Sequence, residues 1–147
     1  MALVLNEEQQ MLKDAAHDFL GDRAPVSHLR RIRDSGNTDG FSRDLWSEMV
    51  DMGWTAILVP EEHGGLGYGF TGMGIVLEEA GRTLTPSPLL GTALVGVTAL
   101  SVAGSDEQCG SILPRVVRGA CGAARCRPAG RGSSTSALIS RSPASGA

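Results

Sequence analysis

Acidic residues are missing from the last part of this sequence. All sixteen Asp and Glu residues precede Cys109, and none occurs between that cysteine and residue 147. Residues 1–119 contain 9 basic and 16 acidic side chains, a net charge of −7, whereas residues 120–147 contain four Arg and carry +4. This change in composition indicates that the chain consists of two parts with different properties.

Large apolar side chains are also scarce in residues 120–147. Of these 28 residues, 23 are Ala, Gly, Ser, Arg or Pro, and the only large apolar ones are Leu138 and Ile139. So little apolar surface cannot offset the entropy lost when a chain is ordered. We therefore predict a folded domain at residues 1–119 and a disordered segment at residues 120–147.

Other absences exclude whole classes of protein. The acidic balance of residues 1–119 excludes nonspecific nucleic-acid binding, which needs Lys and Arg against phosphates. The three cysteines are odd in number and occur late, so no disulfide framework is indicated. The first ten residues lack the basic region of a secretory signal. We therefore expect a cytoplasmic protein.

Neither a metal site nor a membrane span is expected. His17, His28 and His63 lack the spacing of metal ligands. No charged residue lies between Arg82 and Asp106, but this stretch contains prolines and has no flanking cluster of positive charge. A buried helix is the better interpretation of the stretch.

Apolar residues recur at helical spacing through most of residues 1–119, and no alternating pattern is long enough for a sheet. In the first helix the apolar face contains Met11, Leu12, Ala15, Ala16, Phe19 and Leu20. Asn6 and Gln9 predict a capping box before this helix, and Ser105 and Gln108 predict another before the last. Between them we expect helices from Pro25 to Asp34, from Ser42 to Gly53, from Thr71 to Arg82, and from Pro88 to Val102, the last of these capped by Ser87. Residues 54–59 are expected to be extended or irregular. The prediction is an all-α, up-and-down bundle of five or six helices.

Two sequence matches to functional motifs are set aside. Residues 67–72 fit G-x-G-x-x-G, but a dinucleotide-binding loop follows directly after a strand and has an acid about 20 residues later. Neither condition is met, so we interpret these glycines as a turn that permits close helix approach. Glu61, Glu62 and His63 are adjacent on one turn, which favours solvated side chains over acid–base chemistry.

The order of several short segments is more specific than any one motif. It resembles the N-terminal helical domain of acyl-CoA dehydrogenases over about residues 3–119. The segments that carry this resemblance are Leu5–Leu12, Asp18–Leu20, Leu45–Trp46, Met52–Trp54, Val59–Gly67, Leu77–Gly81, Gly104–Gln108 and Leu113–Arg115. Residues 82–90 resemble the bacterial branch of the family that degrades steroids and cholesterol.

The resemblance implies oxidation of an acyl-CoA thioester to the 2,3-enoyl-CoA. In this family a glutamate removes the α-proton, the β-hydrogen passes as hydride to FAD, and an electron-transfer flavoprotein reoxidises the flavin. Most of these groups belong to a central β-domain and a C-terminal helical domain. We therefore assign no catalytic residue, flavin-binding residue or metal ligand to this sequence, and we expect it not to retain FAD alone.

The resemblance also implies where an acyl-CoA substrate would lie. The turn containing Glu62, Gly64 and Gly65 is on the substrate side in the family. The helix that follows supplies Leu89, Leu90, Leu94 and Val97, which would line the acyl chain. Simple packing in the helical core is the alternative role for these four side chains.

Residues 120–147 begin where the β-domain of the family would start. Arg outnumbers Lys twelve to one in this sequence, which suggests GC-rich coding DNA, and such DNA read out of frame encodes mainly Ala, Gly, Arg, Pro, Ser and Cys. We interpret residues 120–147 as an out-of-frame tail, and the chain as a fragment of a dehydrogenase that is inactive alone. The alternative is a non-catalytic module that pairs with a dehydrogenase subunit, in a homo- or hetero-oligomer, or that binds acyl-CoA.

Overall fold

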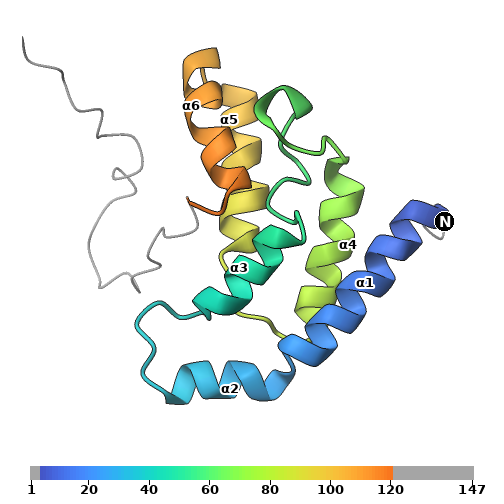
Figure 1. Cartoon of the computed structure of the whole chain (residues 1–147), viewed down its shortest axis with the longest axis vertical. Coiled ribbons are helices and arrows are strands. Elements are labelled where there is room, and N and C mark those ends of the chain that lie inside the picture. The colour runs from blue at the N-terminus through green and yellow to red at the C-terminus, as the bar shows by residue number, and fades with distance from the viewer. Residues whose placement is uncertain (1–3, 121–147) are drawn as a thin grey trace, which may run out of the picture.

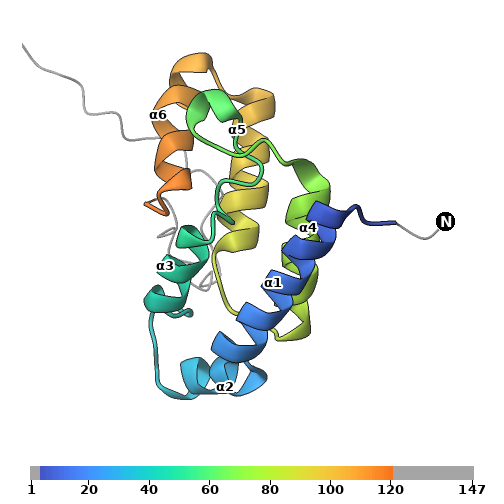
Figure 2. The ribbon, with the colours of Figure 1, turned by 45° about the vertical axis from the view of Figure 1, so that its right-hand side comes forward.

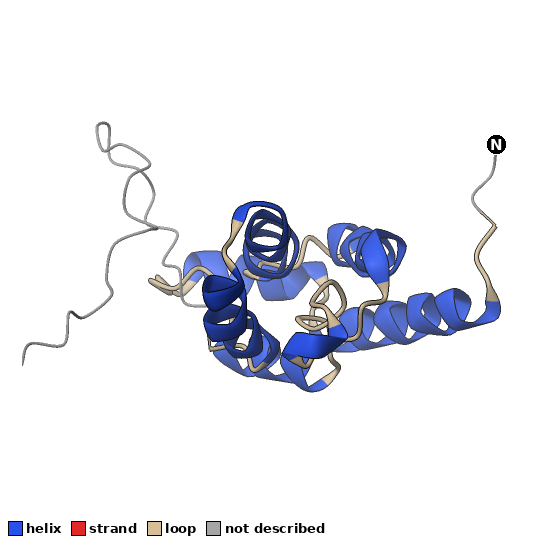
Figure 3. Ribbon diagram, turned by 90° about the horizontal axis from the view of Figure 1, so that it is seen from above, coloured by secondary structure: helices blue, strands red, loops and turns tan. Residues whose placement is uncertain are grey.

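The computed structural model describes residues 4–120, and every regular element in this part of the chain is a helix (Figure 3). The elements are α1 (Glu7–Arg23), α2 (Val26–Asp34), α3 (Arg43–Asp51), the 3-10 turn η1 (Glu61–His63), α4 (Gly69–Arg82), the π-helical segment η2 (Leu90–Gly96), α5 (Val97–Ala103) and α6 (Asp106–Val117). The all-α prediction is confirmed over these residues. The predicted tail lies outside them from residue 121 onward.

Both predicted capping boxes form. The Asn6 side chain accepts a hydrogen bond from the Gln9 backbone N–H at 2.8 Å, and the Gln9 side chain accepts one from the Asn6 N–H at 3.1 Å. Ser105 and Gln108 make the same reciprocal pair before α6. Each cap satisfies backbone N–H donors that the first helical turn leaves free, and it contributes about 1 kcal/mol to the free energy of unfolding.

The helices form two neighbouring groups. Helix α1 packs along α4, and α6 packs against α5 (Figures 1 and 2). In these views α3 lies between the groups, and α2 runs across their lower end. The larger core cluster contains Ala16, Leu20, Ala24, Leu45, Trp46, Met49, Trp54, Ile57, Met73, Val76, Ala80, Leu89 and Ala93, and the smaller one contains Val59, Val97, Leu113 and Val116.

Helix α4 carries a buried carboxylate at its interface with α1. The Glu79 side chain is 2% exposed, and its oxygens lie 2.9 Å from Nδ1 of His17 and 3.2 Å from Nε of Arg82. A buried carboxylate without partners would be strongly destabilising. The His17 contact therefore joins α1 to α4, and the Arg82 contact, which lies within α4, adds a second partner for the carboxylate.

The helix expected from Pro88 differs from the prediction. It begins as the π-helical segment η2 and continues directly into α5, a continuous helix that we call the η2–α5 rod. No side chain caps the start of η2, so the cap predicted at Ser87 is wrong. The first hydrogen bond at this end joins the Thr92 N–H to the Pro88 carbonyl.

The end of the described chain is anchored to α3 and to the segment that follows it. The Trp46 indole N–H donates to the Gly119 carbonyl at 3.3 Å, and the Thr55 hydroxyl donates to the Val117 carbonyl at 2.9 Å. Gly119 has φ +71°, and a Cβ atom there would lie 2.6 Å from a Val50 methyl group. These contacts hold the last described residues against α3 and the segment that follows it.

No helix within residues 4–120 is long and apolar enough to cross a membrane. The uncharged stretch between Arg82 and Asp106 instead supplies Leu89, Ala93 and Val97 to the two core clusters. This agrees with the buried helix predicted for it.

Candidate functional site

The turn that resembles the substrate side of the family is built on a folded-back segment. The N–H groups of Leu66, Gly67 and Tyr68 donate to the carbonyls of Ala56, Val59 and Ile57, at 2.8 to 3.0 Å. These bonds pin residues 66–68 against residues 56–59. Residues 54–59, expected to be extended or irregular, form a series of tight turns with mostly buried side chains.

Two glycines determine the path of this turn. Gly64 has φ +81°, in the left-handed region that side chains with a Cβ adopt at a cost. Gly65 lies so close to the backbone of Val59 that a Cβ atom on it would be 1.9 Å from the Val59 carbonyl oxygen. Glu62 projects into solvent, 3.6 Å from the imidazole of His63.

The four apolar candidates on the η2–α5 rod differ in exposure. Leu89 and Val97 are fully buried in the two core clusters, and Leu94 packs partly against the larger one. Leu90 is 55% exposed. Its exposed neighbours Val95 and Val102 follow at intervals of five and seven residues, which is close to one turn of π-helix and two turns of α-helix.

The rod therefore has a buried face and an exposed apolar face. We call Leu90, Val95 and Val102 the outer face of the rod. The turn at residues 60–67 lies beside the α5 end of the rod, whereas Leu89 and Leu90 begin its other end (Figures 1 and 2). None of the seven predicted wall residues lines either of the two concavities described below.

A groove that the sequence analysis missed lies between α1 and residues 52–68. It has a volume of about 290 Å³ and is lined by Glu8, Met11, Leu12, Met52, Trp54, Ile57, Leu66 and Tyr68. All but Glu8 are largely apolar. Met11, which the helical pattern assigned to the buried face of α1, is 71% exposed.

A second cavity, of about 380 Å³, lies between α2, residues 35–42 and the start of α3. Its lining is polar and includes His28, Arg31, Asn37, Arg43 and Asp44. Burial, and to a smaller extent the nearby Arg31 guanidinium, lowers the pKa of His28. Arg43 is paired with Asp39 at 2.7 Å, whereas the Arg31 guanidinium lies 3.3 Å from the His28 ring.

The glycines at residues 67–72 act structurally, as predicted. Gly67 and Gly69 have positive φ and lead into α4. A Cβ on Gly72 would lie 2.2 Å from the Tyr68 ring, so this glycine permits that aromatic side chain to pack on the helix. No strand precedes the motif within the described residues.

Comparison with known proteins identifies the family. The profile described as "Acyl-CoA dehydrogenase, N-terminal domain" matches residues 6–120, so the chain belongs to the acyl-CoA dehydrogenase family through this domain. Among curated relatives, acyl-CoA dehydrogenase IpdE2 of Mycobacterium tuberculosis is 36% identical over 103 residues, covering 69% of this chain and 32% of the relative. The (2S)-methylsuccinyl-CoA dehydrogenase of Cereibacter sphaeroides is 29% identical over 117 residues, covering 78% of this chain and 21% of the relative.

Solved structures show the same relationship. A variant of the Tcur3481-Tcur3483 steroid ACAD is 33% identical with a TM-score of 0.68, covering 77% of this chain and 30% of that chain. A chain of the ChsE4-ChsE5 complex from M. tuberculosis is 26% identical with a TM-score of 0.72, covering 82% of this chain and 32% of that chain. The chain therefore spans between about a fifth and a third of the length of these relatives.

The family uses FAD, but residues 4–120 do not fit this cofactor by themselves. The groove offers apolar walls and one carboxylate, which would repel a pyrophosphate. The polar cavity contains Arg31, but its Arg43 is paired with Asp39 and Asp44 adds a carboxylate. No chemical step through the flavin is derived from these residues.

Proposed function

We propose that residues 4–120 form the N-terminal wall of an acyl-CoA pocket in a FAD-dependent acyl-CoA dehydrogenase. The observation that carries this proposal is the outer face of the η2–α5 rod, where Leu90, Val95 and Val102 are 55%, 58% and 82% exposed. An apolar face of this kind, unmatched by any of the six α-helices, is suited to contact with another part of the enzyme or with its substrate. The turn containing Glu62, Gly64 and Gly65 would border the same pocket.

The substrate class that we propose is an acyl-CoA from steroid breakdown. Support comes from the similarity to IpdE2 and to a protein described as a steroid ACAD, together with the resemblance of residues 82–90 to that branch. The family reaction would convert the acyl-CoA to its 2,3-enoyl-CoA. An electron-transfer flavoprotein would accept the electrons, and the protein would act in the cytoplasm.

We further propose that a polypeptide of these 147 residues neither retains FAD nor oxidises acyl-CoA by itself. The family match covers only the N-terminal domain, and neither concavity described above suits a flavin. The base and most flavin contacts implied by the family belong to the other domains.

A second candidate function is that of a non-catalytic subunit. The observation in its favour is the similarity to a chain of the ChsE4-ChsE5 complex, in which two different proteins assemble. In this case the outer face of the rod would contact a dehydrogenase subunit rather than another domain of the same protein.

Flavin content and co-purification distinguish these possibilities. The 147-residue chain would be purified with added FAD and tested for flavin absorbance and for oxidation of a steroid-derived acyl-CoA with an artificial electron acceptor. We expect neither, and stoichiometric flavin with turnover would contradict the proposal. Stable co-purification with a full-length dehydrogenase, lost in a Val95→Asp variant, would instead support the subunit function.

A further inference from the structure

Helix α4 ends in a turn that places a leucine in the left-handed backbone region. Leu84 has φ +54°, and within residues 4–120 it is the only residue other than glycine with a positive φ. A side chain with a Cβ adopts this conformation at a cost, and bulky residues are rarely found in it. Gly, and less often Asn, is the usual residue at such a position.

The hydrogen bonds of this turn explain why a left-handed residue is needed. The Thr85 N–H donates to the Ala80 carbonyl at 2.9 Å. The Leu84 N–H donates to the Gly81 carbonyl at 3.2 Å. This pair of bonds is a Schellman motif, which ends a helix with one left-handed residue. The Thr83 and Thr85 hydroxyls also lie 2.6 Å apart, so the turn holds Leu84 in its strained conformation.

The Leu84 side chain gains little from packing within the domain. It is 57% exposed, and it belongs to neither core cluster. Burial of apolar surface therefore does not account for a leucine at a position that favours glycine. Backbone strain that local stability does not explain is characteristic of residues with a functional role.

The strained turn lies at one end of the proposed pocket wall. Residues 83–89 join the end of α4 to the start of the η2–α5 rod, and Leu90 of the outer face follows them directly (Figures 1 and 2). The turn at residues 60–67, which would border the same pocket, lies beside the other end of the rod. A large acyl group that starts at that turn and follows the outer face would therefore reach Leu84 with its far end.

We propose that Leu84 is a specificity-determining residue that contacts the far end of a large, apolar acyl group. Its side chain adds apolar surface beyond Leu90, which favours an acyl group long enough to cover it and gives no advantage to a short one. The hydrogen bonds of the turn fix the direction in which this side chain leaves the backbone. This inference rests on the acyl-CoA pocket proposed above and adds a residue to the seven predicted for its wall.

The first measurement is the thermal stability of the 147-residue chain. Leu84→Gly should raise Tm by about 3 °C, because glycine relieves the left-handed strain. Leu84→Ala should not raise Tm, since alanine keeps the strain and lacks the larger side chain. A lower Tm for Leu84→Gly would show that the leucine serves stability, which would overturn the proposal.

The second measurement uses an enzyme in which residues 6–120 replace the corresponding domain of IpdE2 from M. tuberculosis. The two substrates are butyryl-CoA, which is short, and cholanoyl-CoA, whose acyl group ends in an apolar steroid ring system. Leu84→Gly should lower kcat/KM about tenfold for cholanoyl-CoA and less than about twofold for butyryl-CoA. Leu84→Met, which keeps an apolar side chain of similar size, should retain both values.

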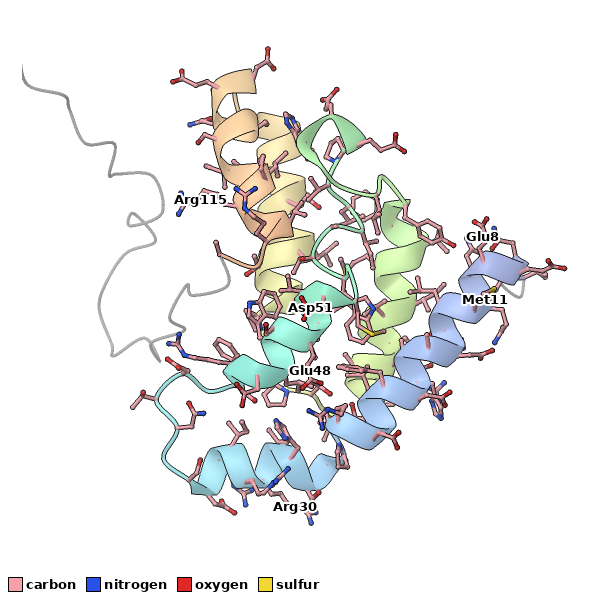
Figure 4. The ribbon with its side chains drawn as sticks, viewed as in Figure 1. Glu8, Met11, Arg30, Glu48, Asp51 and Arg115 are labelled. Atoms are coloured by element: carbon pink, nitrogen blue, oxygen red, sulfur yellow. The ribbon has the colours of Figure 1, made fainter. Side chains whose placement is uncertain are left out.

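A matched control removes an exposed apolar side chain elsewhere. Met11 is 71% exposed and lies beside Glu8 at the start of α1 (Figure 4). Met11→Ser should leave kcat/KM unchanged for both substrates. A loss with cholanoyl-CoA in this variant equal to that in Leu84→Gly would show a nonspecific effect and contradict the proposal.

The remaining outcomes separate this inference from the function on which it rests. An equal fall in kcat/KM for both substrates would mean that Leu84 contacts another domain, and no fall for cholanoyl-CoA would mean that it contacts no substrate. Either result overturns the role given to Leu84 but leaves the pocket in place. A parent chimera that binds FAD but oxidises neither substrate would instead contradict the acyl-CoA pocket itself, and this inference with it.

Discussion

At the scale of single residues, the turn beside the proposed acyl pocket depends on two glycines for different reasons. Gly64 needs its left-handed backbone but has open space around its Cα, whereas Gly65 is blocked by the Val59 carbonyl oxygen. A Cβ can therefore be accommodated at Gly64 with local strain alone, but at Gly65 the backbone must move.

Substitution by Ala should therefore lower the free energy of unfolding by different amounts at the two positions. Gly64→Ala should lower the free energy of unfolding by about 1 kcal/mol, the cost of a left-handed Ala. Gly65→Ala should lower it by about 3 kcal/mol, because overpacking at a backbone oxygen displaces the segment. Urea denaturation of both variants measures the difference, and equal losses would show that the close approach at Gly65 is not a constraint.

The pKa of His28 predicts a dependence of stability on pH. Burial and Arg31 lower this pKa in the folded protein from an ordinary value of 6.5. The unfolded chain therefore binds more protons below that value, so the stability is fully present above about pH 6.5 and falls as the pH decreases through it. A His28→Gln variant should lose less stability than the parent between pH 7.5 and 5, as measured by denaturation. An identical pH profile in the two proteins would contradict this.

At the scale of elements, the contact between α1 and α4 combines apolar packing with the buried Glu79. Its neighbour Glu78 is the natural comparison, because it also pairs with Arg82 but is 55% exposed. Arg82 holds the pKa of the exposed Glu78 carboxyl below its usual range. The two neighbours thus share a partner, but only Glu79 is removed from water.

Replacing Glu79 or Glu78 by Ala should have different effects on the stability of the domain. Glu79→Ala should destabilise the domain by about 3 kcal/mol, since it leaves a cavity and removes the partner of His17 and Arg82. Glu78→Ala should cost less than about 1 kcal/mol, as for other surface ion pairs. Hydrogen exchange in α1 should accelerate only in the Glu79 variant. Equal exchange rates in both variants would mean that Glu79 does not stabilise the packing of α1 on α4.

Most elements could be predicted from local signals in the sequence. The capping residues Asn6, Ser42 and Ser105 mark helix starts because their side chains bond to free backbone N–H groups nearby, and each does so in the structure. The π-helical start of the η2–α5 rod has no such signal, because it depends on tertiary packing of Leu89 and Ala93. The groove could not be predicted for a similar reason. Helical periodicity placed Met11 on a buried face, but Met11 is 71% exposed and only its neighbour Leu12 packs against the larger core cluster.

At the scale of the whole molecule, the last described residues are tied to the middle of the domain. Trp46 and Thr55 donate hydrogen bonds to the backbone carbonyls of Gly119 and Val117. What this domain lacks is cover for the outer face of the rod. That face is the central link between the structure and the proposed function, because a pocket wall needs the rest of the enzyme to become a pocket.

A chimeric enzyme tests this link most directly. Residues 6–120 of this chain would replace the corresponding domain of IpdE2 from M. tuberculosis, and KM and kcat would be measured for a steroid-derived acyl-CoA. We predict that the chimera binds FAD and turns over, and that Leu90→Asp on the outer face raises KM or abolishes turnover while Met11→Asp, on the α1 side of the groove, leaves both constants unchanged. A flavin-loaded chimera whose kinetics are the same with and without Leu90→Asp would contradict the account.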